Sequence, residues 1–293
     1  MHLGQIRHDG AVIAAIFEGG SARPIPAHTL CDLINRADVE MTPVHELASR
    51  LASRHPVAAT PVIPIFPSEV WASGCTYETS AAFRDGETVE VDKGTREGMY
   101  AYVYREPRPE IFFKGTSRVC VGPGQYIGIR SDSKFTAPEP ELAVVLGKRG
   151  KIVGYTLAND VSAWDIEREN ALYLPQSKVY SACCALGPVM VTTDEITDPY
   201  KLQMTCEILR GDEVRFSGST STAKLHRKIE DIVDYLTRSN PVPAGSVLCT
   251  GTGIIVTEEV ALAPGDVVLI KASRGVRAER IVERLIASRG RAE

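Results

Sequence analysis

The amino-acid sequence predicts an α+β fold that is rich in β-strands and begins with a small α/β domain. Most apolar residues stand in short runs between Gly and Pro turns, and few stretches have the spacing of a helix. Many short strands and few long helices are typical of a β-rich roll, barrel or sandwich. The chain has 293 residues, which is enough for one large domain or two unequal ones.

The first 65 residues differ from the rest and predict the small N-terminal domain. They contain an apolar strand at 11–17 and two helical patterns at 30–37 and 44–54. The stretch HPVAATPVIPIFP follows. Its prolines are typical of an extended connector, because proline restricts its own backbone and that of the residue before it. We therefore place a boundary near residue 65, between domain 1–65 and domain 66–293.

The second domain is predicted to hold most of the strands. Its clearest helix is 223–238, where five apolar residues fall on one helical face. Two shorter helices are predicted at 79–84 and 161–170. The strand-like runs lie at 111–113, 126–129, 141–147, 151–160, 187–193, 202–209, 245–250 and 266–272.

Composition and charge exclude several classes of protein. The formal net charge is −4, so no global positive field favours nucleic acid or an anionic membrane. No run approaches the roughly 18 apolar residues of a membrane span, and the first 20 residues lack the pattern of a signal peptide. We expect a small-molecule partner, no nucleic acid and no membrane.

The cysteines indicate a reducing compartment. There are seven, an odd number, and they are scattered along the chain without a CxxC motif or a nearby His at zinc-ligand spacing. We expect reduced thiols, no disulfide and a cytoplasmic location.

Three carboxylates suggest a site for a hard cation. Glu139 and Glu141 stand two residues apart at the start of a predicted strand, so their side chains share one face, and Asp160 ends the next predicted strand. Carboxylate oxygens favour Mg²⁺, Mn²⁺ or Ca²⁺ over zinc. Alternatively, the two glutamates are loop charges beside Pro138 and Pro140, and Asp160 caps a helix. The residues alone leave both interpretations open.

Four further residues are candidates for chemistry near such a site. Lys178 and Lys114 lie in apolar or turn-rich surroundings. There a lysine can neutralise an anion or act as a base, or it can be a surface residue with a buried stem. Glu110 follows a proline at a strand start and is a candidate general acid. Thr252 belongs to TGTG, which either presents a hydroxyl and N–H groups to an anion or forms an ordinary turn.

A series of motifs connects these candidates to a known family. In chain order they are RPEIFFKG, VGPG, RSDS, PEPELAVVLG, GYTLANDVSAWD, LPQSK, CALGPVMVTTDEI and LCTGTG. Over residues 66–285 this series resembles the fumarylacetoacetate hydrolase family. The resemblance implies a mixed β-sandwich roll, usually dimeric, which binds Mg²⁺ or Mn²⁺ through an ExE pair and a later Asp. Those positions match Glu139, Glu141 and Asp160.

Within that family the chain resembles enzymes that dehydrate 2-keto-3-deoxy sugar acids, and the likeness includes its N-terminal part. It implies that Glu110, Lys178 and the Thr252 hydroxyl line the substrate pocket. We take Glu110 and Lys178 as the candidate catalytic pair and expect Tyr77, Lys114 and Thr252 to contact the substrate. Elimination needs a base for the C3 proton and an acid for the C4 hydroxyl, and either member of the pair can take either role. We expect Mg²⁺-dependent conversion of a 2-keto-3-deoxy pentonate to 2,5-dioxopentanoate by a homodimer or higher homo-oligomer.

The helix that carries the catalytic dyad in hydrolases of this family is altered here. In those enzymes a His–Glu pair activates water, but Ser80 and Phe83 occupy the matching positions, and neither is a base near pH 7. A second departure is Trp164, where relatives usually carry Arg. The alternatives are therefore a hydrolase or decarboxylase acting on an acylpyruvate-like 2-oxo acid, or a metal-binding homologue that Trp164 has made inactive.

Overall fold

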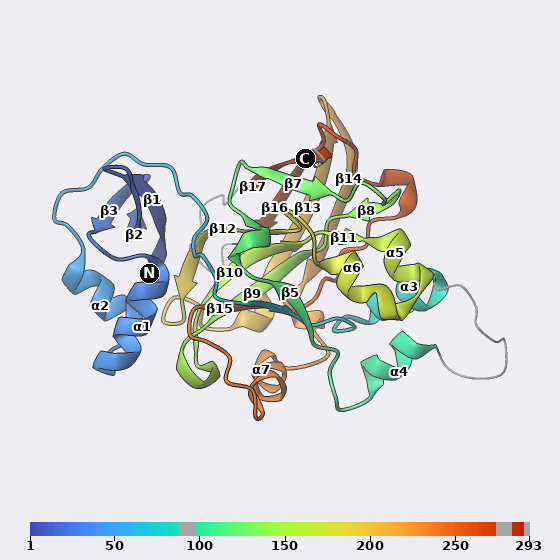
Figure 1. Cartoon of the computed structure of the whole chain (residues 1–293), viewed down its shortest axis with the longest axis horizontal. Helices are drawn as coiled ribbons and strands as arrows, with labels where there is room; N and C mark the ends of the chain where they lie inside the picture. Colours follow the sequence, from blue (N-terminus) through green and yellow to red (C-terminus); the bar gives the residue numbers. More distant parts are fainter. Residues whose placement is uncertain (88–97, 274–282, 290–293) are drawn as a thin grey trace.

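A computed structural model describes residues 1–87, 98–273 and 283–289. In this part of the chain the backbone forms a ten-stranded sheet, a five-stranded sheet, a two-stranded sheet and seven α-helices (Figure 1). Both large sheets are open at their ends. The expected β-rich α+β fold is confirmed.

The ten-stranded sheet extends from the N-terminal strands to the centre of the molecule (Figure 1). Its strands are β1 His2–His8, β2 Ala11–Glu18, β3 Ser21–Ile25, β4 Val70–Ala72, β5 Phe112–Gly115, β6 Cys120–Val121, β9 Pro140–Leu146, β10 Ile152–Asp160, β12 Cys184–Thr192 and β15 Ser246–Cys249. Their spatial order is β3-β2-β1-β12-β10-β9-β15-β4-β5, with β6 beside β12. β10 therefore lies in the middle, antiparallel to β9 and β12.

The five-stranded sheet packs against the larger one. Its strands are β7 Tyr126–Ile129, β13 Gln203–Arg210, β14 Glu213–Ser221, β16 Val267–Ala272 and β17 Glu283–Arg289. Their order is β14-β13-β16-β17-β7, and β8 (Thr136–Ala137) pairs separately with β11 (Ser162–Ala163). Leu142 and Leu157 of the larger sheet share one buried core with Ile208 and Ile270 of the smaller sheet. The two sheets therefore enclose apolar side chains between them.

The helices gather at the two ends of the molecule and below the larger sheet (Figure 1). Their bounds are α1 Leu30–Glu40, α2 Val44–Leu51, α3 Glu78–Glu87, α4 Met99–Arg105, α5 Trp164–Glu169, α6 Leu174–Lys178 and α7 Ile229–Thr237. α1 and α2 lie beside the N-terminal strands, whereas α3, α5 and α6 lie at the opposite end. Within the described residues, no helix has the length and apolar character needed to cross a membrane.

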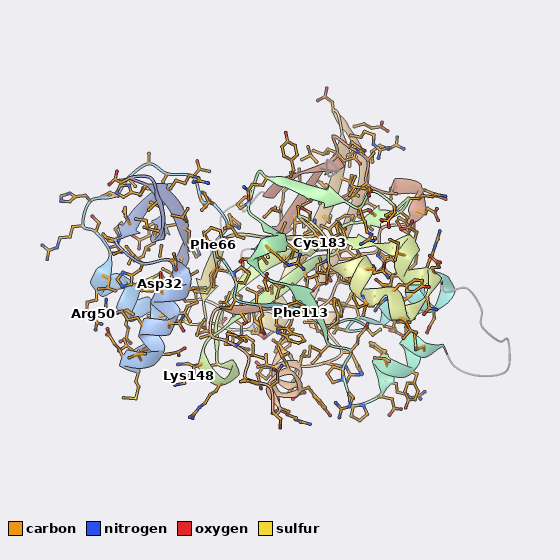
Figure 2. The ribbon with its side chains drawn as sticks, viewed as in Figure 1. Asp32, Arg50, Phe66, Phe113, Lys148 and Cys183 are labelled. Carbon is orange, nitrogen blue, oxygen red and sulfur yellow. The ribbon has the colours of Figure 1, made fainter. Side chains whose placement is uncertain are left out.

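The N-terminal segment is joined to the rest of the chain through the larger sheet. β1 pairs antiparallel with β12, and Leu3 lies opposite Met190. The Asp38 carboxylate of α1 accepts the backbone N–H of Lys148 at 2.8 Å, and Figure 2 labels Lys148 beside the N-terminal helices. Apolar residues of both parts also share one buried core. The boundary near residue 65 stays a prediction, and the sheet continues across it.

Two predicted helices start later than expected. The helix predicted at 223–238 is the shorter α7, because the backbone N–H of His226 donates to the Thr76 carbonyl at 2.9 Å and ties the preceding chain to another segment. The helix predicted at 161–170 is α5, which begins only after β11 has paired with β8. The sequence located both helices, the first by its apolar spacing, but long-range backbone hydrogen bonds determined where they begin.

The carboxylates that were predicted to bind a cation lie where β9 and β10 meet. Every residue of β9 is buried, and so is every residue of β10 after the first. The backbone N–H of Asp160 donates to the Glu139 carbonyl at 2.9 Å, so the start of β9 lies beside the end of β10. The strands β9 and β10 thus place the side chains of Glu139, Glu141 and Asp160 in the interior of the protein.

The thiols give a prediction that needs no substrate. Five of the seven cysteines are buried, and Cys31 and Cys120 are partly buried. Burial limits the access of an oxidant to a thiol. We expect seven thiols per chain to react with a thiol reagent in denaturant without reductant, the full count in the sequence. A count that rises after reduction would contradict this expectation.

Candidate active site

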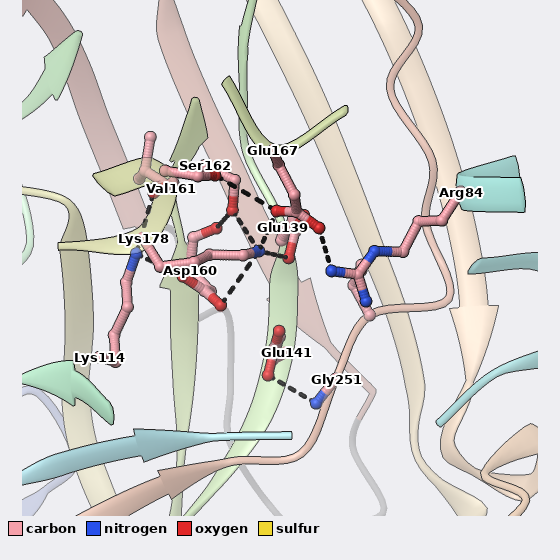
Figure 3. Close-up of polar contacts among 12 residues, drawn as sticks. Arg84, Lys114, Glu139, Glu141, Asp160, Val161, Ser162, Glu167, Lys178 and Gly251 are labelled. Carbon is pink, nitrogen blue, oxygen red and sulfur yellow. Dashed lines mark hydrogen bonds and ion pairs between the residues drawn. The ribbon is translucent and has the colours of Figure 1, made fainter. Parts of the chain in front are cut away.

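Glu139, Glu141 and Asp160 meet in a small cavity, where the central strands β9 and β10 of the larger sheet begin and end (Figure 3). Each contributes a carboxylate oxygen, and these oxygens lie within 4.8 Å of one another. Both carboxylate oxygens of Asp160 are buried, and each faces a lysine: Oδ1 forms an ion pair with Lys114, and Oδ2 lies 3.6 Å from Lys178 Nζ. Three buried carboxylates at this spacing are a donor set that fits one hard divalent cation.

Burial raises the pKa of two of these carboxyl groups. It is the largest cause for Glu141, whose pKa lies well above its usual range, and the neighbouring Asp160 and Glu139 add to the shift. For Glu139, burial outweighs the opposing attraction of Lys178 and again raises the pKa. These carboxyl groups therefore resist ionisation unless a positive ion joins them.

Two buried lysines flank the carboxylates. Lys114 is fully buried and forms an ion pair with Asp160. Lys178, only 3% exposed, donates to Glu139 at 2.9 Å and to the Ser162 hydroxyl at 2.6 Å. Burial acts to lower the pKa of each lysine, but the nearby carboxylates, Asp160 foremost, outweigh it and raise both. Neither lysine is a surface residue.

Glu110 is linked to Lys178 through two residues that the sequence did not suggest, Arg84 and Glu167. The Oε2 atom of Glu110 accepts from Arg84 Nη1 at 2.9 Å and from the Cys75 thiol at 3.3 Å. Arg84 also pairs with Glu167, whose Oε2 atom lies 3.5 Å from Lys178 Nζ. Burial acts to raise the pKa of Glu167, but Arg84 and Lys178 outweigh it and lower this pKa to about 2. Opposite charges thus alternate from Glu110 to Lys178.

With every carboxyl group ionised, the charges around the cavity do not balance. Within the described part of the chain, the carboxylates of this network outnumber its cationic side chains by two. The carboxylates are Glu110, Glu139, Glu141, Asp160 and Glu167, and the cations are Arg84, Lys114 and Lys178. One divalent cation would supply the missing positive charge, which supports the assignment of the three carboxylates as its ligands.

The TGTG segment forms the opposite wall. The backbone N–H of Gly251 donates to Glu141 Oε2 at 2.6 Å, and Gly251 has a φ of +92°, a conformation that favours glycine. Thr252 lines the cavity, and its hydroxyl donates to a β9 carbonyl at 2.9 Å. Tyr77 is buried against Gly253. TGTG is therefore more than an ordinary turn, since it holds a carboxylate in place.

The structure brings most of the predicted residues together, at different depths. Lys178 and Thr252 share the cavity wall with the three carboxylates, whereas Lys114 lies behind Asp160. Glu110 borders a larger outer pocket between α4, α6 and α7. Glu110 thus borders the outer pocket and contacts Arg84 and Cys75, which line the small cavity. The substrate contacts expected of Tyr77, Lys114 and Thr252 stay predictions.

Comparison with known proteins agrees with this arrangement. The model of the family described as "Fumarylacetoacetate (FAA) hydrolase C-terminal" matches residues 92–282. The chain belongs to the fumarylacetoacetate hydrolase family.

Several members of the fumarylacetoacetate hydrolase family are similar over most of their length. A 2-dehydro-3-deoxy-D-arabinonate dehydratase of Saccharolobus solfataricus is 52% identical over 72% of this chain and 70% of its own. A probable 2-keto-3-deoxyxylonate dehydratase of Haloferax volcanii is 42% identical over 81% and 82%. A solved structure of 2-keto-3-deoxy-D-arabinonate dehydratase, complexed with magnesium and 2,5-dioxopentanoate, is 38% identical, has a TM-score of 0.80 and covers 99% of this chain and 100% of that one.

Phe83 and Trp164, two of the three residues at which sequence analysis expects a departure from the family pattern, contact each other. Phe83 and Trp164 pack edge to face, with ring centroids 5.3 Å apart, and Phe135 stacks on Trp164 at 6.4 Å. Ser80, at the other dyad position, lines the cavity with a hydroxyl. The Arg84 guanidinium lies 5.8 Å from the centre of the Trp164 ring. A guanidinium therefore reaches this region from α3.

Proposed function

We propose that this protein is a Mg²⁺-dependent dehydratase that converts a 2-keto-3-deoxy pentonate into 2,5-dioxopentanoate. The observation that carries the proposal is the three-carboxylate site with Lys178 and Glu110 beside it and no histidine among the described residues that line the cavity. The dehydratase names of the two relatives, and the ligands of the similar solved structure, support the substrate class.

Glu139, Glu141 and Asp160 would hold the Mg²⁺ or Mn²⁺ ion. When bound, the cation would polarise the 2-keto group of the substrate and so make the C3 proton more acidic. The protein itself must then accept that proton and deliver one to the C4 hydroxyl.

The two proton-transfer residues differ in their distance from the proposed ligands. Lys178 contacts Glu139 and Asp160, whereas Glu110 contacts Arg84 and Cys75. We therefore assign the C3 proton, next to the keto group, to Lys178 and the C4 hydroxyl, one carbon farther away, to Glu110. Lys178 must first lose its own proton, and the positive charge of a cation held by Glu139 and Asp160 would offset the carboxylates that raise its pKa. Loss of water leaves a C3=C4 double bond. Transfer of protons from C5 and its hydroxyl to C3 and C4 then gives the aldehyde.

A substrate panel tests this proposal. With Mg²⁺ present, we expect aldehyde formation from at least one 2-keto-3-deoxy pentonate, the arabinonate or the xylonate form, and almost no cleavage of acetylpyruvate. The reason is that Ser80 and Phe83 cannot activate water as a His–Glu dyad does. Addition of a chelator serves as the control. If acetylpyruvate is cleaved or decarboxylated rapidly and no pentonate gives aldehyde, the proposed dehydratase activity is wrong and the alternative, a hydrolase or decarboxylase, takes its place. Absence of all turnover would favour the inactive homologue.

The oligomeric state and the compartment are part of the same proposal. We propose a homodimer or higher homo-oligomer in the cytoplasm. The resemblance to a family whose members are usually dimeric supports the oligomer, and the odd number of cysteines supports the compartment. Light scattering coupled to gel filtration that found only monomer would contradict the first statement. Thiols found paired in disulfides would weaken the second.

A further inference from the structure

A buried arginine stands between the two residues to which we assign proton transfer. Arg84 lies on α3 and is only 4% exposed, and its side chain lines the cavity together with the three carboxylates. The geometry points to Arg84 as a positioning residue that holds Glu110 directly and Lys178 through Glu167, and so fixes the separation of the acid and the base. This inference rests on the proposed function.

The guanidinium uses different nitrogens for its two carboxylate partners. Nη1 donates to Glu110 Oε2 at 2.9 Å. Nη2 pairs with Glu167 (Figure 3). Its flat face lies 4.4 Å from the centre of the Tyr100 ring. A planar fork held at both ends and stacked on a ring has little freedom to turn. Because a guanidinium stays protonated, Arg84 supplies a fixed charge and takes no part in proton transfer.

The second half of the link runs from Glu167 to Lys178. Glu167 is 1% exposed, and its Oε2 atom accepts from the Ser177 hydroxyl at 3.2 Å and lies 3.5 Å from Lys178 Nζ. Ser177 and Lys178 are neighbours at the end of α6. One carboxylate therefore fixes the end of the helix that carries the proposed base.

The backbone at Gly74 packs closely against the ion pair of Arg84 and Glu110. A Cβ atom at Gly74 would lie 2.1 Å from Glu110 Oε2 and 2.8 Å from Arg84 Nη1. The chain thus packs directly against the ion pair, and a side chain at position 74 would have to displace it. Close packing of this kind holds Glu110 in one place relative to the cavity.

The inference predicts a loss in turnover without a matching loss in binding. Lysine keeps the charge of Arg84 but cannot donate from two separate nitrogens of a planar fork to two carboxylates. We expect kcat to fall by about 10-fold to 100-fold in Arg84→Lys and by at least as much in Arg84→Ala, the usual scale for a misplaced catalytic group. We expect KM and the Mg²⁺ affinity to stay within about threefold, because Arg84 pairs with none of the three proposed ligands.

Two measurements distinguish positioning from a general defect in the fold. Because Arg84 acts on Glu110 directly and on Lys178 through Glu167, only the second effect remains in Glu110→Gln. Adding Arg84→Ala to Glu110→Gln should therefore lower kcat by at least about threefold less than it does in the wild type. Methylguanidinium should restore part of the turnover of Arg84→Ala, at least about threefold. The control is Arg210→Ala, which removes a bidentate pair with buried Asp266 in the smaller sheet. It should leave kcat unchanged.

The experiment uses the full chain with Mg²⁺ and the best pentonate of the panel. If the wild type turns over the pentonate and the kcat of Arg84→Lys lies within threefold of the wild-type value, the inference is overturned and the proposed function stays intact. The inference is also overturned if the fold reduction in kcat of the double variant equals the product of the reductions in Arg84→Ala and Glu110→Gln. If the wild type turns over no pentonate, the proposed function itself fails. Arg84→Lys also covers the case in which Arg84→Ala does not fold.

Discussion

Replacing Lys178 by Met is expected to lower kcat by at least about 100-fold while the protein still binds Mg²⁺. The ammonium contacts two proposed metal ligands at 2.9 Å and 3.6 Å but is not itself a ligand. A positioned acid or base typically contributes about 10² to 10⁴ in rate. Glu110→Gln should have an effect of the same order. Steady-state kinetics and calorimetric titration with Mg²⁺, carried out on the same preparations, measure both quantities.

The two variants can also be told apart by isotope exchange. If Lys178 is the base, Lys178→Met should lose exchange of the C3 protons with D₂O, whereas Glu110→Gln should retain it although water is not eliminated. Proton NMR of the substrate during incubation measures this exchange. Lys201→Met, which removes a lysine that is 80% exposed, is the matched control and should behave as the wild type. Turnover of Lys178→Met within threefold of the wild type would exclude Lys178 from proton transfer.

Replacing Glu141 by Gln should weaken Mg²⁺ binding by at least about 100-fold and abolish turnover at ordinary Mg²⁺ concentrations. Loss of residues that merely support a metal ligand costs about 10-fold to 100-fold in affinity, and loss of a ligand should cost more. Glutamine keeps the size of the side chain and removes its repulsion with Glu139 and Asp160. The metal-free variant should therefore be at least as stable to heat as the metal-free wild type, which separates lost binding from misfolding.

Calorimetry with Mg²⁺ decides this second prediction. Glu213→Gln, in an exposed pair with Arg215 on the hairpin of the smaller sheet, is the matched control. Unchanged Mg²⁺ affinity in Glu141→Gln would remove this residue from the proposed ligand set and, with it, the interpretation of the cavity as a metal site.

The parts of the site that the sequence predicts are those that depend on local geometry. Glu139 and Glu141 share a face because of the two-residue period of a strand, and Asp160 joins them because the next strand returns antiparallel beside them. Arg84 and Glu167 have no such signal. Each is one charged residue on a short helix, and its partner lies on a different helix. Only the tertiary fold shows that they meet.

Sequence analysis missed the strands β1 and β14 for two opposite reasons. β14 is mostly exposed and carries polar residues, so it contains no apolar run. β1 is largely buried, but Gln5 interrupts its apolar pattern. That side chain donates to the Ile63 carbonyl and accepts the Leu30 N–H, each at 3.0 Å, so a polar residue satisfies backbone groups inside the core. Such a role depends on contacts far away in the chain and leaves no trace in the local pattern.

The unbalanced charge of the cavity has a thermodynamic consequence for the whole chain. The pKa values of Glu139 and Glu141 are raised above the ordinary 4.5, so in metal-free protein their contribution to folding stability is fully present below that pH and is lost as the pH rises through the raised values. A cation that binds only the native state opposes this loss, by about 2.7 kcal/mol at a concentration one hundred times its Kd. Divalent metal supply therefore contributes to the equilibrium stability of the folded chain at neutral pH, and we expect chelation to destabilise the protein as well as stop its chemistry.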